Sequence, residues 1–201
     1  MSEEAHKVKK EDNKKVLPRV ASLKQPKKVN QNGTSVIPCG EKIPKNHKCF
    51  NASGSIEEAI GLIGRLKSFH FNLETTNARK MFIFARLTKI QEDLTNVIKS
   101  ITTTPLNSSK HTASRFSMDK VKELEDSINS LSSTKYKGIP GSTLIESDIY
   151  MIWSVIRRCE RQVISCKDPS IGIVVEESVI LYMNKLGEYF SHLITHMANK
   201  F

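Results

Sequence analysis

Apolar residues recur every three or four positions along most of the chain after residue 54, which is the spacing of one face of an α-helix. Ser55 is expected to cap a first helix over residues 55–71, because its hydroxyl can accept a bond from the first turn. The same pattern predicts four further helices, which cover residues 76–101, 117–131, 144–166 and 176–199.

The segments between these stretches are typical of turns. Residues 106–117 are polar, and residues 136–142 hold two glycines and Pro140, which disfavours a continuing helix. No segment shows the sustained alternation of apolar and polar residues that a half-buried strand needs. The sequence therefore predicts an all-α fold, a five-helix bundle over residues 34–201, whose apolar faces suit assembly with copies of itself.

Composition separates this bundle from a basic N-terminal tail. The chain has 201 residues, of which 38% are hydrophobic and 26% are charged, as expected for one folded domain with a polar extension. Residues 1–33 are rich in lysine and poor in apolar residues, so we expect them to be disordered. Over residues 1–50, 12 Lys and Arg stand against 5 Asp and Glu, and this segment carries most of the net charge of +10.

The basic tail leaves cellular location and polyanion binding open. Its lysines, and the acids Glu3 and Glu4, differ from an arginine-rich mitochondrial presequence, so we favour the cytoplasm and keep the mitochondrion as the alternative. Binding to nucleic acid is the weaker interpretation, because no aromatic residues alternate with the lysines to stack on bases. No apolar run reaches the ~18 residues of a membrane span, and we expect no membrane contact.

Cysteine and histidine spacing predicts no metal site. None of the four cysteines forms a C-x-x-C pair. His192 and His196 lie one helical turn apart, but they have no third ligand nearby in the sequence. We interpret them as ordinary histidines on a helix surface.

The fourth expected helix carries an Arg-Arg-Cys-Glu-Arg run within an otherwise apolar stretch. Arg157 and Arg161 are four residues apart and share a face, and Glu160 lies one turn from Arg157. Two guanidinium groups beside a carboxylate suit a polyphosphate, although a ladder of internal salt bridges explains the same residues. In the next helix, Asn184 and Glu188 are also four apart and share a side.

Short phrases along the chain keep the order and spacing of those in one enzyme family. Ile-Pro-Gly at 139–141, RRCER at 157–161 and YMNKLGEYF at 182–190 resemble the phrases LPGG, RxxxRRxER and YLNRLSDYLF of the PduO-type ATP:corrinoid adenosyltransferases. Upstream, LTKIQEDLTNV at 87–97 resembles the family's LxxIQxxL helix, and GEKIPK at 40–45 resembles its GxxxxK phrase. On these residues the chain is identified as a member of that family.

The resemblance implies a helical bundle that forms a homotrimer, with ATP bound between neighbouring subunits. It implies transfer of the 5′-deoxyadenosyl group of ATP to cob(I)alamin, with Mg²⁺ assisting and tripolyphosphate leaving. It also assigns two groups of site residues by their matching positions. The catalytic group is Arg157, Glu160 and Glu188, and the group that binds the nucleotide is Lys28, Gly33, Ser35, Lys45, Arg157, Arg158, Arg161 and Asn184.

Several departures from the family pattern fall on functional positions. The family's Gly-rich TGDxG loop corresponds to residues 29–33, Val-Asn-Gln-Asn-Gly, which lose a glycine that phosphate-wrapping amides depend on. Trp153 stands where the family has an arginine, and Lys185 and Glu188 stand for Arg and Asp. We therefore expect an adenosyltransferase of reduced efficiency, or a catalytically degenerate member that acts as a nucleotide- or corrinoid-binding or protein-interaction scaffold.

Overall fold

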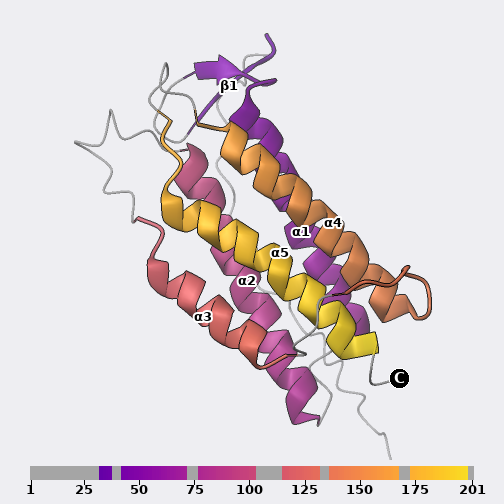
Figure 1. Cartoon of the computed structure of the whole chain (residues 1–201). Helices are drawn as coiled ribbons and strands as arrows, with labels where there is room; N and C mark the ends of the chain where they lie inside the picture. Colours follow the sequence, from indigo (N-terminus) through magenta and orange to yellow (C-terminus); the bar gives the residue numbers. More distant parts are fainter. Residues whose placement is uncertain are drawn as a thin grey trace, which may run out of the picture.

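A computed structural model describes residues 32–37, 42–71, 77–102, 115–131, 136–167 and 173–198. Within these ranges the chain forms five α-helices and one small antiparallel sheet (Figure 1). In chain order the elements are β1 (Thr34–Val36), β2 (Lys42–Pro44), α1 (Lys48–His70), α2 (Ala78–Thr102), α3 (Met118–Asn129), α4 (Leu144–Ser165) and α5 (Glu177–Ala198). The predicted five-helix architecture is confirmed. The tail predicted over residues 1–33 lies almost entirely outside the described residues.

Helix α5 is the centre of the described bundle. It packs against α4 and α3, and α1 packs against α4 and α2 (Figure 1). Tyr182, Leu186 and Phe190 of α5 are completely buried at the spacing of one helical face. Each such side chain contributes about 1.5–3 kcal/mol through removal of apolar surface from water. None of the described helices combines the length and the apolarity that crossing a bilayer requires.

Helix α1 begins seven residues before its predicted start. Ser55 lies inside α1, so the prediction that it caps the helix is wrong. The cap is His47, whose ring nitrogen accepts a hydrogen bond from the backbone N–H of Cys49 at 3.2 Å. Cys49 and Ala52 are completely buried, and the apolar face of α1 therefore extends to the N-terminal side of Gly54.

The other four helices end within two residues of their predicted limits. Ser117 caps α3, since its hydroxyl accepts a bond from the N–H of Asp119 at 3.1 Å. Thr143 caps α4 in the same way, with the N–H of Glu146 as donor at 3.2 Å. The turn before α4 depends on Gly141, whose φ of +134° is a conformation that side chains disfavour.

The sheet was not predicted from the sequence. Strands β1 and β2 have three residues each, and Ser35 lies opposite Ile43 in the antiparallel register. Gly33 precedes β1 with a φ of +66°, and its carbonyl accepts a hydrogen bond from the N–H of Lys45 at 2.7 Å. Three-residue strands are too short to show an alternating pattern, which is why the sequence does not reveal them.

A set of charged residues, of which Asp93 is buried, lies where α2 meets α3 and α5. The carboxylate of Asp93, completely buried on α2, forms an ion pair with Lys120 of α3 and accepts a hydrogen bond from the Tyr182 hydroxyl at 3.2 Å. Arg86 of α2 lies 3.7 Å from the carboxylate of Glu123 of α3. We call Arg86, Asp93, Lys120 and Glu123 the α2–α3 charge cluster. Its two pairs have opposite polarity, so they favour one placement of α3 along α2.

Candidate functional site

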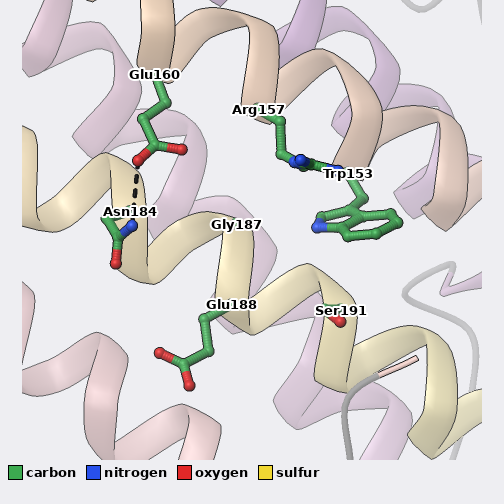
Figure 2. A pocket seen from close by; sticks show the side chains of 7 residues that line it. All are labelled: Trp153, Arg157, Glu160, Asn184, Gly187, Glu188 and Ser191. Atoms are coloured by element: carbon green, nitrogen blue, oxygen red, sulfur yellow. Dashed lines mark hydrogen bonds between the residues drawn. The ribbon is translucent and has the colours of Figure 1, made fainter. Parts of the chain in front are cut away.

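A hollow of about 200 Å³ opens between α4 and α5 (Figure 2). The residues from each helix are spaced mainly by three or four, so each helix presents one stripe of side chains to the seam. The residues that line this α4–α5 hollow are Trp153, Arg157 and Glu160 from α4 and Asn184, Gly187, Glu188 and Ser191 from α5. The structure thus brings together all three predicted catalytic residues, Arg157, Glu160 and Glu188, with Asn184.

Arg157 provides an available positive charge at the hollow. Its guanidinium carbon lies over the indole ring of Trp153, 5.2 Å from the ring centroid (Figure 2). Among the described residues no carboxylate forms an ion pair with it. A guanidinium stays charged at physiological pH and carries five N–H donors. The side chain can therefore bind an anion without first losing a partner.

Glu160 and Asn184 join the two helices across the hollow. The side-chain amide of Asn184 donates a hydrogen bond to the carboxylate of Glu160 at 3.1 Å (Figure 2). Glu160 lies one turn from Arg157, but its hydrogen bond in this structure goes to Asn184. The amide oxygen of Asn184 is left as an acceptor for a ligand hydroxyl or amine.

Glu188 belongs to two neighbouring hollows. A second one, of about 230 Å³, lies between α3 and α5 and is lined by Glu125, Ile128, Asn129, Lys185 and Glu188. Lys185 donates to Glu188 at 3.2 Å and forms an ion pair with Glu125 of α3, also at 3.2 Å. The hydrogen bonds to Glu125 and then to Glu188 raise the pKa of Lys185 above its usual value. The Glu188 carboxylate is therefore held beside a lysine that stays protonated.

The other two arginines of the run lie outside the α4–α5 hollow. Arg158 forms an ion pair with Glu58 of α1. Arg161 is exposed on α4, one turn beyond Arg157, and it does not line the hollow. The interpretation as an internal salt bridge therefore holds for Arg158. Arg157 is the arginine that faces the hollow. The predicted roles of Arg158 and Arg161 in nucleotide binding stay predictions.

The predicted N-terminal contacts do not line the hollow either. Gly33, Ser35 and Lys45 lie in or beside the small sheet, at the end of the bundle where α1 begins and α4 ends (Figure 1). Lys45 is exposed, and its side chain is open to solvent. Lys28 lies outside the described residues. In one copy of the chain these positions are therefore separate from the α4–α5 hollow.

Sequence reasoning missed the contribution of Ser191 to the hollow. Ser191 is buried, and its hydroxyl accepts a hydrogen bond from the backbone N–H of Tyr136 at 3.2 Å. The spacing of three to four from Asn184 through Glu188 to Ser191 would have placed it on the same stripe. The interpretation of His192 as a surface residue is wrong, because only 6% of it is exposed.

Comparisons with known proteins identify the family of this chain. The sequence pattern of the family described as cobalamin adenosyltransferase matches residues 27–197, most of the chain. The corrinoid adenosyltransferase MMAB of Mus musculus is 29% identical to this chain in an alignment 203 positions long. The alignment covers 94% of this chain and 80% of the mouse protein. The chain therefore belongs to the cobalamin adenosyltransferase family, and the predicted class of transferase is confirmed.

Solved structures share the fold. A variant of the PduO-type ATP:corrinoid adenosyltransferase from Lactobacillus reuteri, complexed with cobalamin and ATP, superimposes with a TM-score of 0.67 at 22% identity. The match covers 83% of this chain and 88% of that one. Another variant of the L. reuteri enzyme, complexed with ATP, gives a TM-score of 0.63, with 83% and 89% of the two chains covered.

Proposed function

We propose that this protein transfers the 5′-deoxyadenosyl group of ATP to cob(I)alamin. The observation that carries the proposal is Arg157, a cation without a carboxylate partner among the described residues, facing Asn184 across the α4–α5 hollow. Family membership supports the same reaction. In the reaction the cobalt(I) electron pair forms a bond to C5′, the C5′–O bond breaks, and its electrons leave with tripolyphosphate.

The protein's share of this chemistry is alignment and electrostatic stabilisation. Cob(I)alamin is itself a strong nucleophile, so no serine or cysteine nucleophile is required. Negative charge grows on the departing phosphate oxygens, and the guanidinium of Arg157 would stabilise that charge. Asn184, held by Glu160, would fix the nucleoside part of ATP. Arg161, exposed one turn away, would extend the positive surface along the phosphates.

Magnesium is expected to arrive with the nucleotide. Mg²⁺ is usually held by phosphate oxygens and waters together with one or two carboxylates. The described residues hold no group of three or more metal-ligating side chains, and the hollow offers the carboxylates of Glu160 and Glu188. Glu160 already accepts the hydrogen bond of Asn184, and Glu188 accepts that of Lys185, so Mg²⁺ at either carboxylate would compete with one of these bonds. A bound Mg²⁺ would neutralise part of the phosphate charge.

A homotrimer would complete the site. The predicted nucleotide contacts Gly33, Ser35 and Lys45 lie apart from the hollow within one copy of the chain. A neighbouring copy that places its small sheet over the α4–α5 hollow would bring the two sets together. We therefore propose that ATP binds between subunits and that the monomer binds it weakly. Location in the cytoplasm, with the mitochondrion as the alternative, also stays a proposal.

Two measurements on the full chain test the reaction. Calorimetry with ATP and Mg²⁺ should show binding, and incubation with ATP, Mg²⁺ and cob(I)alamin under reducing, anaerobic conditions should give the absorbance of adenosylcobalamin. Absence of ATP binding would exclude the enzyme. Binding of ATP without product would favour the catalytically degenerate scaffold, for which the specific observation is Trp153 in place of a second arginine.

A further inference from the structure

A series of aromatic rings leads from the turn before α4 to the α4–α5 hollow. Tyr136 lies edge-on to Tyr150, with ring centroids 6.0 Å apart, and Tyr150 lies edge-on to Trp153 at 5.4 Å. Edge-to-face pairs of this kind prefer one relative orientation of the rings. The last ring of the series, the indole of Trp153, lies beneath the Arg157 guanidinium.

The far end of this aromatic series is fixed to the fold. The Tyr136 hydroxyl donates to the buried carboxylate of Glu146 at 2.6 Å, and the Tyr136 backbone N–H donates to Ser191. Burial, followed by the bond to Glu146, raises the pKa of Tyr136 to about 12, so the hydroxyl keeps its proton. The indole of Trp153 is thus packed against a ring that hydrogen bonds restrain.

The contact between Trp153 and Arg157 differs from a salt bridge in what it leaves free. A carboxylate partner would orient a guanidinium, but it would occupy N–H donors and cancel the charge. The face of an indole attracts the cation through its quadrupole and uses none of the in-plane N–H groups. A cation held in this way keeps its donors for an anion.

We propose that Trp153 is a positioning residue for Arg157, and that it orients the guanidinium toward the polyphosphate chain of the nucleotide. This inference rests on the proposed function, because it takes the polyphosphate of ATP as the ligand. It assigns a role to the tryptophan that stands in place of the family's arginine. Trp153 does not contact the reacting atoms. It acts through Arg157, and its loss weakens polyphosphate binding.

The chain supplies its own reporter for this inference. Trp153 is its single tryptophan, so the indole emission of the full-length protein comes from the hollow alone. Tripolyphosphate added to the unmodified protein should change that emission, with the same midpoint as its binding measured by calorimetry. In Arg157→Gln, used as the control, the emission change should disappear. Calorimetric binding without an emission change, or an emission change that survives in Arg157→Gln, would overturn the inference.

Two substitutions at the same position separate the ring face from its bulk. Trp153→Phe keeps an aromatic face, and tripolyphosphate affinity should stay within about twofold. Trp153→Leu keeps an apolar side chain without that face, and affinity should fall about fivefold, the range of a cation–π contact. Equal affinities of the two variants would contradict the proposal. Circular dichroism checks that both variants are folded. If either variant is unfolded, the emission titration of the unmodified protein tests the proposal instead.

The outcomes for this inference and for the proposed function can be told apart. If adenosylcobalamin forms and tripolyphosphate binds, but Trp153→Leu matches Trp153→Phe, the inference fails and the reaction stands. If neither ATP nor tripolyphosphate binds to the unmodified protein, both fail. If tripolyphosphate binds with the expected emission change but no adenosylcobalamin forms, the positioning role stands and transfer does not.

Discussion

The α2–α3 charge cluster and the α4–α5 hollow use similar side chains in opposite ways. In the cluster, Asp93 is completely buried and has both a lysine and a tyrosine hydroxyl as partners. In the hollow, Arg157 is exposed, and among the described residues its guanidinium lies over the ring of Trp153 and pairs with no carboxylate. Charges that are paired inside the fold hold helices together. A charge left without a counter-ion at the surface is available to a ligand, at the cost of contributing little to stability.

Arg157 and Arg158 show the same contrast within one helix. Successive residues of a helix point about 100° apart, so the two guanidinium groups face different neighbours. Arg158 reaches α1 and pairs with Glu58, whereas Arg157 faces α5. Of two neighbours in the sequence, Arg158 therefore connects helices, whereas Arg157 is available to a ligand.

The largest effect is expected from Asp93→Ala in the charge cluster. The change leaves the ammonium group of Lys120, whose side chain is 21% exposed, without its carboxylate, and it removes the acceptor of Tyr182. Breaking a buried pair from one side costs about 3–5 kcal/mol, and we expect the free energy of unfolding in urea to fall by about that amount. A loss below about 1 kcal/mol would contradict the buried pairing.

The matched control for Asp93 is Lys89→Ala on the same helix. Lys89 lies 3.9 Å from Glu92, and both side chains are well exposed. Exposed pairs contribute about 0–1 kcal/mol, so this change should leave the unfolding free energy within about 0.5 kcal/mol of the parent.

The next effect concerns Arg157→Gln and appears in activity. Loss of one donor that stabilises transition-state charge lowers rates by about 100-fold, and we expect kcat/KM for ATP to fall by that factor. The unfolding free energy should stay nearly constant, because no described carboxylate depends on Arg157. Arg158→Gln is the comparison: it breaks the exposed pair with Glu58, which should cost at most about 1 kcal/mol of stability, and it should lower kcat/KM less. Equal losses of kcat/KM would show that the two arginines are not separated in function.

The limits of the helices were largely readable from the sequence, because local signals fix them. Apolar spacing and the caps Ser117 and Thr143 set the ends of α3 and α4. The start of α1 was not predicted, because a histidine is a less usual helix cap and Gly54 looked like the boundary of the helix. Strands β1 and β2 are defined by their pairing with each other, and such pairing leaves no pattern in three residues.

The sequence predicts which site residues share one face of a helix. It does not predict which neighbouring helix each of those faces contacts. Spacing placed Arg157 and Glu160 on one side of α4 and Asn184 and Glu188 on one side of α5. The family resemblance, not the spacing, assigned the two sides to one site. Arg158 turns away from α5 and pairs with Glu58 of α1. The spacing of residues within α4 does not show where Glu58 lies. His192 was placed on the surface because it pairs with His196 and has no third metal ligand nearby in the sequence. It is buried because α5 packs against both α3 and α4.

A smaller effect is expected from Glu146→Gln behind the hollow. The hydrogen bond from Tyr136, followed by bonds from Ser142, holds the pKa of Glu146 below its usual value, although burial acts in the opposite direction. The carboxylate therefore adds stability at pH values above the unfolded pKa of about 4.3, and this contribution is lost as the pH falls through the lower folded pKa. We expect Glu146→Gln to lower the unfolding free energy by about 1–2 kcal/mol at pH 7.

Unfolding measured at acidic pH tests whether the folded protein lowers the pKa of Glu146, as stated above. The difference between the parent protein and Glu146→Gln should shrink when unfolding is measured at successively lower pH below about 4.3. Glu57→Gln, which changes an exposed glutamate of α1, is the control and should show no such difference. A difference that grows on acidification would mean that the folded protein raises the pKa of Glu146.

The smallest effect is expected from Lys185→Met, at the edge of the hollow. Lys185 links Glu125 of α3 to Glu188 of the hollow, so its loss removes a positive charge that both carboxylates share. Added negative charge at this distance should weaken tripolyphosphate binding about threefold in calorimetry at low salt, and less at 0.5 M salt because ions screen exposed charges. The double change Lys185→Met with Glu188→Gln removes one carboxylate and should restore part of the affinity. An unchanged affinity in the single variant would show that phosphate binds beyond the reach of Glu188, and would shift the proposed site along α4 toward Arg161.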